Sequence, residues 1–232
     1  MEKMFALVPA AGSGARMGAA QPKQYLELAG RPVLHHTLAR LAGCADIARV
    51  FVVLSAGDTR FAALDFGALA GRIEPLYCGG ATRADSVFNG LLALRDLVEA
   101  DDWVLVHDAV RPCLPRAALA RLIETLRGDD TGGLLALPVV DTLKRADSEA
   151  RVAHTESREF LWQAQTPQMF RYRLLLDALR AFDPATVTDE ASAVERLGRR
   201  PRLVMGDTRN LKVTYPQDLA LAALIAAVPE DA

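Results

Sequence analysis

The chain has 232 residues, of which 51% are hydrophobic and 24% are charged. This composition is typical of a soluble globular protein with a real core and excludes a disordered chain. The net charge of −2 argues against bulk binding of nucleic acid, which needs a basic surface. Any anionic substrate must therefore be met by locally placed Arg and Lys side chains.

Short apolar runs alternate with helical patterns along the chain. We expect strands at Phe5–Val8, Val50–Leu54, Ile73–Tyr77, Trp103–Val106 and Leu134–Leu137, and helices around Val33–Leu41, Arg83–Leu97, Arg116–Leu126, Leu174–Ala181, Glu190–Leu197 and Asp218–Ala226. Continuously apolar strands are typical of a sheet that is buried on both faces. The pattern therefore predicts an α/β fold, a three-layer, mostly parallel twisted sheet with helices on both faces. The last apolar stretch, Leu219–Val228, is too short to span a membrane and predicts a final helix packed on the sheet.

The polar segment Asp141–Glu159 breaks this alternation. Two short strand-like pieces flank Ala146–Ala150, so we expect a β-hairpin arm that projects from a single domain comprising residues 1–232. Composition alone favours a plainer interpretation, in which the segment is a mobile surface loop.

The cysteines indicate the compartment. Cys44, Cys78 and Cys113 are odd in number and widely spaced, which supports neither a disulfide framework nor a CxxC metal site. The simplest interpretation is a reducing compartment, so we expect a cytoplasmic protein.

A glycine-rich loop follows the first predicted strand directly, with the sequence PAAGSGARMG at Pro9–Gly18. Small residues let backbone N–H groups approach phosphate oxygens closely, and ligands of open α/β sheets bind at the carboxyl ends of the strands. Arg16 and Lys23 add full positive charges. The loop therefore predicts a phosphate-binding site.

Two familiar phosphate loops do not fit this segment. A Walker A loop needs Gly-Lys-Ser/Thr, but Ala19 and Ala20 follow Gly18. In a dinucleotide-binding GxGxxG the third glycine would stand one position earlier than Gly18, and Pro22 interrupts a helix that starts at the loop. The loop thus argues against both a P-loop NTPase and an NAD-dependent dehydrogenase.

Motifs spread along the chain make the signal specific. In order they are PAAGSGARMG with PKQY, GGATRADSV at Gly79–Val87, VHDAVRP at Val106–Pro112, DTLKR at Asp141–Arg145, HTESREFLWQAQTPQ at His154–Gln168, TDEA at Thr188–Ala191 and NLKVTYPQDL at Asn210–Leu219. Together they resemble the family of 2-C-methyl-D-erythritol 4-phosphate cytidylyltransferases over nearly the whole chain. The resemblance implies a Rossmann-like nucleotidyltransferase fold and Mg²⁺-dependent transfer of CMP from CTP to methylerythritol phosphate in non-mevalonate isoprenoid biosynthesis.

The resemblance also assigns roles to individual residues. Arg16 and Lys23 match the pair that stabilises the transition state. The positions implied to bind CTP are Ala10, Ala11, Gly12, Ser13, Gly14, Lys23, Gly80, Arg83, Ser86 and Ala109. Some relatives carry Asp at the position of Ala81, so any role of that acid in recognition of the base is absent here.

A second group of residues is implied to place the acceptor, a small sugar-alcohol phosphate. These are Asp108, Arg111, Thr142, Arg158, Thr166, Thr188 and Lys212. Asp108 matches an acidic residue near the metal and is the candidate Mg²⁺ ligand. Thr142 and Arg158 lie on the arm, which in this family reaches into the partner subunit, so the resemblance implies a homodimer with exchanged arms.

The residue types suit this chemistry even when the family resemblance is set aside. A phosphate monoester is largely dianionic near neutral pH, because its second pKa is about 6, so it can attack the α-phosphorus without a general base. What remains is to hold two polyanions together and to absorb charge on the transferring phosphorus. That calls for Arg, Lys, backbone N–H groups and Mg²⁺, which prefers phosphate oxygens and one or two carboxylates.

Plainer interpretations of these residues stay open. Arg16 and Lys23 could be surface charges, Asp108 could cap a turn before Pro112, and Arg158 could be a solvated charge on the arm. Thr188 precedes Asp189-Glu190 and is also a candidate helix N-cap. The four histidines show no metal-ligand spacing, and we expect structural roles for them.

Two other functions remain as alternatives. A ribitol-5-phosphate cytidylyltransferase would use the same chemistry with a different acceptor, although those relatives lack the DTLKR and HTESR pattern. A catalytically silent nucleotide sensor is disfavoured, because Arg16, Lys23, Asp108 and Lys212 are all present.

Overall fold

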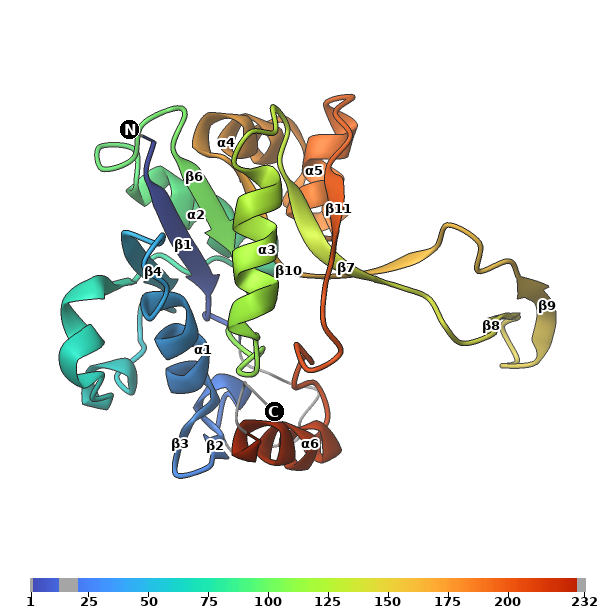
Figure 1. The fold of residues 1–232 in the computed structure, drawn as a ribbon, viewed down its shortest axis with the longest axis horizontal. Coiled ribbons are helices and arrows are strands. Elements are labelled where there is room, and N and C mark those ends of the chain that lie inside the picture. The colour runs from blue at the N-terminus through green and yellow to red at the C-terminus, as the bar shows by residue number, and fades with distance from the viewer. Residues whose placement is uncertain (1, 13–20, 229–232) are drawn as a thin grey trace.

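A mixed sheet of seven strands runs through the part of the chain that the structure describes, residues 2–12 and 21–228 (Figure 1). The structure is a computed structural model. The strands of this sheet are β1 (Met4–Pro9), β4 (Arg49–Val53), β5 (Ile73–Leu76), β6 (Trp103–Val106), β7 (Gly133–Pro138), β10 (Trp162–Arg171) and β11 (Arg202–Met205). Their order is β11-β7-β10-β6-β1-β4-β5. All neighbours are parallel except β10, which runs antiparallel to β6 and β7, so the predicted mostly parallel sheet is confirmed.

Helices cover both faces of this sheet. These are α1 (Val33–Ala42), α2 (Arg83–Ala93), α3 (Arg116–Leu126), α4 (Tyr172–Ala181) and α5 (Glu190–Arg196). A further helix, α6 (Pro216–Ala227), lies away from the sheet. Short 3₁₀ helices occur at η2 (Lys23–Tyr25), η3 (Phe61–Ala63), η4 (Gly67–Arg72) and η5 (Pro184–Thr186). Two small hairpins pair β2 (Glu27–Leu28) with β3 (Arg31–Pro32) and β8 (Leu143–Ala146) with β9 (Val152–Glu156).

The alternation of side chains along β1 divides the core in two. Ala6 and Val8 pack with residues of α1 and α3 on one face. Phe5 and Leu7 pack with residues of α2, α4 and α5 on the other. Successive strand residues point to opposite faces, so a strand that is apolar at every position is buried on both sides. This explains why the continuously apolar strands were predictable.

Three elements differ from the sequence-based expectation. β10 and β11 were not predicted, because β10 carries buried glutamines among its apolar residues and β11 is a short edge strand with Leu203 and Met205 exposed. The prediction that the last helix packs on the main sheet is wrong. Instead α6 contacts β2 and buries Ala222 in a separate apolar cluster with Leu28 and Val33. It lies below the sheet in Figure 1.

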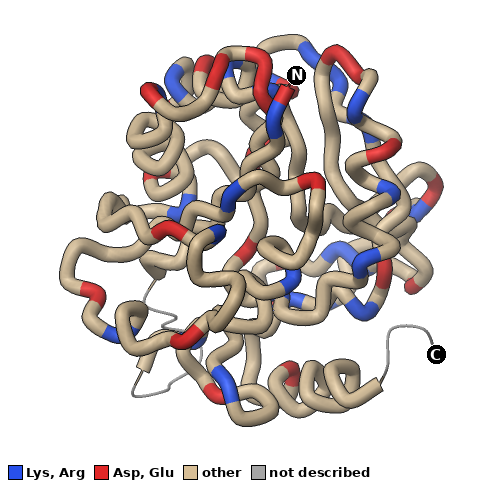
Figure 2. The backbone as a smooth tube through the Cα atoms, turned by 60° about the vertical axis from the view of Figure 1, so that its left-hand side comes forward, with Lys and Arg blue, Asp and Glu red and all other residues tan. Residues whose placement is uncertain are grey.

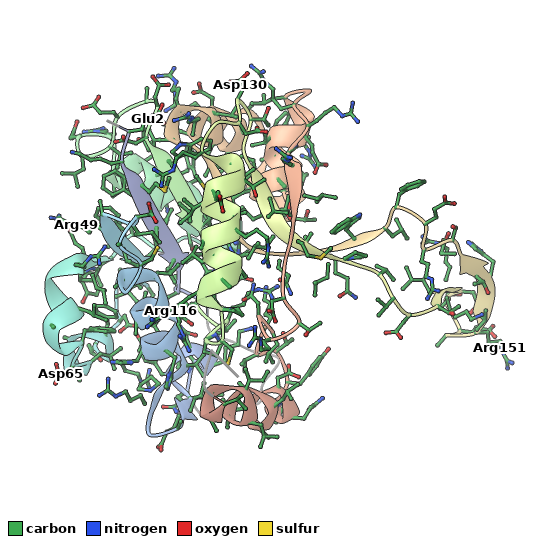
Figure 3. The ribbon with its side chains drawn as sticks, in the orientation of Figure 1. Glu2, Arg49, Asp65, Arg116, Asp130 and Arg151 are labelled. Carbon is green, nitrogen blue, oxygen red and sulfur yellow. The ribbon has the colours of Figure 1, made fainter. Side chains whose placement is uncertain are left out.

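The arm is a hairpin that extends away from the body, on the right of Figure 1. β8 and β9 are antiparallel, with Leu143 opposite Glu156, so the predicted hairpin is confirmed. Arg151, at the turn between these strands, lies at the far end of the arm (Figure 3). Val140, Val152 and Phe160 are exposed along it. The arm thus carries apolar side chains that its own chain does not cover.

The length and apolar character of the helices in the described residues bear on whether one of them could cross a membrane. None of them combines the length and the apolar character that crossing a bilayer requires.

Candidate active site

A cavity of about 500 Å³ opens at the carboxyl ends of β1 and β6. Open α/β sheets bind ligands at this edge. Here the cavity lies where β4 flanks β1 on one side and β6 flanks it on the other. The cavity is lined by Pro9, Ala10, Ala11, Gly12, Lys23, Gln24, Gly80, Ala81, Thr82, Arg83, Ser86, Asp108, Ala109, Val110 and Lys212. Segments far apart in the sequence therefore meet at one place.

Most of the residues proposed from the sequence for CTP binding lie on this wall. They are Ala10, Ala11, Gly12, Lys23, Gly80, Arg83, Ser86 and Ala109. Ser13, Gly14 and Arg16 lie outside the described residues.

The start of the glycine loop is anchored by a residue to which the sequence assigned no role. Ala10 donates its backbone N–H to Val53 O at 2.8 Å. Gln24, which is buried, donates from Nε2 to the carbonyl oxygens of Ala10 at 2.8 Å and Gly12 at 3.2 Å. Because these bonds occupy the carbonyls at the start of the loop, Gln24 holds the backbone beside the cavity. Its position directly after Lys23, within the PKQY motif, is the sequence feature that could have indicated this role.

A second wall is the N-terminus of α2. Thr82 and Asp85 form a capping box there, which satisfies backbone N–H groups at the helix start. Ser86 accepts the N–H of Gly80 at 3.1 Å. A Cβ at Gly80 would lie 2.3 Å from the Cβ of Asp85, so the close turn requires glycine at this position.

Five charged side chains form what we call the charge cluster: Arg83, Asp108, Arg111, Glu190 and Lys212. Asp108 accepts from Arg83 Nε at 2.9 Å on Oδ1, and from Lys212 Nζ at 2.9 Å and Arg111 Nε at 3.5 Å on Oδ2. Burial by itself would raise the pKa of Asp108. The charges of Arg83, Lys212 and Arg111 outweigh it and hold that pKa far below its ordinary value. Asp108 is therefore a permanent anion that binds three cations.

Glu190 completes the cluster from α5. Its two carboxylate oxygens accept from Nη1 and Nη2 of Arg83 at 2.7 and 3.1 Å. Burial disfavours the charge of Arg83, but Glu190 and Asp108 outweigh it and raise the pKa of Arg83. No role was predicted for Glu190, because a glutamate at the start of a helix is common and its partner, Arg83, is distant in the sequence.

Thr166 lies beside Asp108 and is not among the residues that line this cavity. Its Oγ1 accepts the backbone N–H of Asp108 at 3.0 Å and contacts His107 Nδ1 at 2.9 Å. His107 Nε2 contacts Arg111 O at 3.2 Å, an arrangement in which Nε2 carries the proton and Nδ1 accepts from Thr166. Burial lowers the pKa of His107 to about 4. The pair braces the turn that presents Asp108.

The remaining predicted residues are outside this cavity. Thr188 is exposed, and the N-cap of α5 is Asp189, whose carboxylate accepts the N–H of Ser192 at 2.9 Å. The expectation that Thr188 caps the helix is therefore wrong by one residue. Thr142 and Arg158 are exposed on the arm, where Arg158 Nη1 donates to Val140 O.

The charges around the cavity are a local arrangement. Acidic and basic residues are interspersed along the described backbone (Figure 2), and the net charge is small. Lys23, Arg83 and Lys212 nevertheless converge on one cavity beside a loop of small residues. Such a site can hold two phosphate groups side by side and supply positive charge where it develops. These are the needs of nucleotidyl transfer, and the fold and the cavity place the protein among the nucleotidyltransferases.

Comparison with known proteins identifies the family. The model of the IspD family, 2-C-methyl-D-erythritol 4-phosphate cytidylyltransferase, matches residues 4–227. The enzyme of that name from Laribacter hongkongensis is 61% identical over 97% of this chain and 96% of its own length. That from Nitrosospira multiformis is 58% identical over 97% and 98%. A crystal structure of a 4-diphosphocytidyl-2C-methyl-D-erythritol synthase superposes with a TM-score of 0.87 at 43% identity, covering 97% of this chain and 99% of that one. The chain belongs to the 2-C-methyl-D-erythritol 4-phosphate cytidylyltransferase family.

Proposed function

We propose that the protein transfers CMP from CTP to 2-C-methyl-D-erythritol 4-phosphate, giving 4-diphosphocytidyl-2-C-methyl-D-erythritol and pyrophosphate. The observation that carries the proposal is the meeting of Pro9–Gly12, the start of the glycine loop, with Lys23 and Lys212 in one cavity, in a chain that matches this family from residue 4 to 227. An oxygen of the acceptor's phosphate forms a bond to the α-phosphorus of CTP, and the bond from that phosphorus to the β-phosphate oxygen breaks. Pyrophosphate takes the electron pair of the broken bond.

In this proposal the two ends of the cavity serve different substrates. The loop Ala10–Gly14, with Gly80, Arg83, Ser86 and Ala109, holds CTP. Arg16 and Lys23 stabilise charge on the transferring phosphorus. Lys212, placed by Asp108, holds the acceptor's phosphate. Because that phosphate is already dianionic near neutral pH, the site needs no general base.

Mg²⁺ fits this cavity as a companion of the triphosphate. Asp108 is an acidic residue on the wall, and both of its oxygens already contact cations. Within the described residues no group of three or more His, Cys, Asp or Glu side chains could hold a metal. We therefore propose that Mg²⁺ is held mainly by phosphate oxygens and water, with Asp108 as its one candidate protein ligand. When bound, the ion neutralises negative charge on the phosphates.

We also propose that the chain acts as a single domain whose arm, Asp141–Glu159, exchanges between the subunits of a homodimer. Two observations support this. Val140, Val152 and Phe160 are apolar and exposed along the arm. Thr142 and Arg158, assigned to the acceptor, lie on the arm and are absent from the cavity wall of their own chain. A partner subunit would cover the exposed apolar side chains and would receive Thr142 and Arg158 in its own site.

Subunit mixing tests the exchanged arm. The variants Arg158→Ala and Lys212→Ala are each expected to be inactive. In a heterodimer with exchanged arms, one site collects both lesions and the other has neither. With random pairing about half of the dimers are mixed, so roughly a quarter of wild-type activity should return. A mixture that stays inactive, with heterodimers demonstrated by mass spectrometry, would rule out the shared site.

We propose the cytoplasm as the place of this reaction. Cys44, Cys78 and Cys113 are free thiols, the state that a reducing compartment maintains.

Pyrophosphate release tests the reaction and the acceptor together. The protein is incubated with CTP, Mg²⁺ and either methylerythritol phosphate or ribitol 5-phosphate. Release that depends on methylerythritol phosphate is expected. Equal or faster turnover with ribitol 5-phosphate would overturn the acceptor while leaving cytidylyl transfer in place.

A further inference from the structure

Glu190 is a buried carboxylate that faces the charge cluster from behind the cavity wall. Only 1% of its surface is exposed. It is the first residue of α5, and its two oxygens accept from both Nη atoms of Arg83. This bidentate pair fixes the plane of the guanidinium as well as its position.

The start of α5 is itself held in place. Gln168, on β10 and nearly inaccessible, donates from Nε2 to Asp189 Oδ2 at 2.9 Å. Its Oε1 accepts the backbone N–H of Ala191 at 2.7 Å. Because Gln168 binds the residues on both sides of Glu190, the carboxylate is presented to Arg83 from a rigid support.

Arg83 divides its donors between two carboxylates. Both Nη atoms go to Glu190, and Nε goes to Asp108 Oδ1 at 2.9 Å. Arg83 is also the first residue of α2, an end of a helix where positive charge is disfavoured. A partly buried cation at this position needs carboxylates, and Glu190 fixes the orientation of its guanidinium.

Arg83 thereby stays off the other oxygen of Asp108, which Lys212 contacts closely and Arg111 more distantly. Asp108 Oδ2 accepts from Lys212 Nζ at 2.9 Å, and Lys212 lines the cavity. If Glu190 lost its charge, the two Nη atoms of Arg83 would lack their anion. The nearest anion is Asp108, and a bidentate pair between Arg83 and Asp108 would compete with Lys212 for Oδ2.

We propose that Glu190 is a positioning residue for the acceptor. By binding both Nη atoms of Arg83, it keeps Arg83 off the Asp108 oxygen that Lys212 contacts and so keeps the Lys212 ammonium aimed at the acceptor's phosphate. This role rests on the proposed reaction, in which Lys212 holds that phosphate.

The test compares KM values for the two substrates. Glu190→Gln keeps the shape of the side chain and removes its charge. Measured at saturating CTP, its KM for methylerythritol phosphate should rise about ten-fold. Its KM for CTP should rise by a smaller factor, because Arg83 also borders the proposed CTP site. The matched control is Glu195→Gln, which removes an exposed carboxylate from the same helix and should leave both constants unchanged. A loss of folded enzyme lowers the apparent kcat and cannot produce this split.

A second variant separates positioning from simple stability. In Arg83→Met with Glu190→Gln, the Arg83 guanidinium no longer competes for Asp108, and Arg111 contacts Oδ2 as it does in the wild type, so Lys212 recovers its partner. At saturating CTP, the KM of this double variant for the acceptor should therefore fall back to less than five-fold above wild type. If Glu190 only supports the fold, the double variant will be no better than Glu190→Gln.

The outcomes separate the inference from the proposed function. An acceptor KM within two-fold of wild type in Glu190→Gln overturns the inference, as does a double variant that remains more than five-fold impaired. If Glu190→Gln does not fold, the double variant decides alone, because it removes both members of the buried pair together. Wild-type protein that fails to turn over CTP and methylerythritol phosphate would instead overturn the proposed function.

Discussion

Replacing Asp108 with asparagine should destabilise the protein strongly. The change preserves the shape of the side chain and removes one charge, so it leaves no cavity. Asp108 is 6% exposed and is the shared partner of Arg83, Arg111 and Lys212. Removing one partner of a buried ion pair typically costs about 3–5 kcal/mol, because the charge that remains is buried without compensation. Here that charge is Arg111, since Arg83 keeps Glu190 and the Lys212 side chain is partly exposed. In a chain of this size each kcal/mol lowers Tm by roughly 2–4 °C, so Asp108→Asn should melt roughly 10 °C below wild type.

Differential scanning calorimetry in the absence of substrates measures this loss. The control is Asp96→Asn, because the Asp96 side chain is 85% exposed and pairs only at the surface with Arg95, where an ion pair contributes little. The control should melt within about 2 °C of wild type. The folded-state pKa of Asp108 is lowered, so its stabilisation is complete above its unfolded pKa of about 3.9 and is lost only at more acid pH. The difference between Asp108→Asn and wild type should therefore be constant between about pH 5 and pH 8. A variant that melts with the wild type would refute the structural role of the cluster.

Three further predictions concern single residues. Lys23→Ala and Arg16→Ala should each lower kcat by about 10²–10³ and raise the KM for CTP far less, because these charges act on the transferring phosphorus; a normal kcat with a raised KM would show that the residue only binds. Lys212→Ala should impair use of methylerythritol phosphate with little change in CTP affinity by calorimetry, and a collapse of CTP affinity would place Lys212 on the wrong substrate. Burial lowers the pKa of His107 from 6.5 to about 4, so between these values the unfolded chain takes up a proton that the folded protein does not. Stability should fall by about 3 kcal/mol as the pH drops through this window. Urea unfolding at pH 7 and pH 4.5 would measure the fall, and His107→Gln should lose most of it; an equal pH dependence in that variant would exclude His107 as the cause.

The fold was predictable where burial leaves a simple pattern. β1, β4 and β6 lie within the sheet and are apolar along their length, so their sequences indicate strands directly. β10 is also central, but it carries Gln165 and Gln168, whose amides bond to distant segments of the chain. Buried amides satisfied by tertiary hydrogen bonds look polar in sequence. That is why β10 was missed.

The candidate site was predictable where residues suited to phosphate binding directly follow the end of a strand. The glycine loop after β1 and Asp108 after β6 could be placed on one edge, because the carboxyl ends of parallel strands share it. The side chains that hold these residues in place could not be predicted in this way. Arg83 and Glu190 are 107 positions apart, and no local pattern pairs them. The contacts of Thr166 were not predictable either. Only the three-dimensional arrangement shows that its hydroxyl contacts His107 and the backbone N–H of Asp108.

The central claim is that the acceptor's phosphate attacks the α-phosphorus of CTP. ³¹P NMR during turnover of wild-type protein with CTP, Mg²⁺ and methylerythritol phosphate tests it most directly. The account predicts that the acceptor's monoester signal is replaced by two coupled diphosphate signals, in step with the signal of pyrophosphate. Formation of CDP, or of CMP and pyrophosphate with the acceptor's signal unchanged, would contradict it.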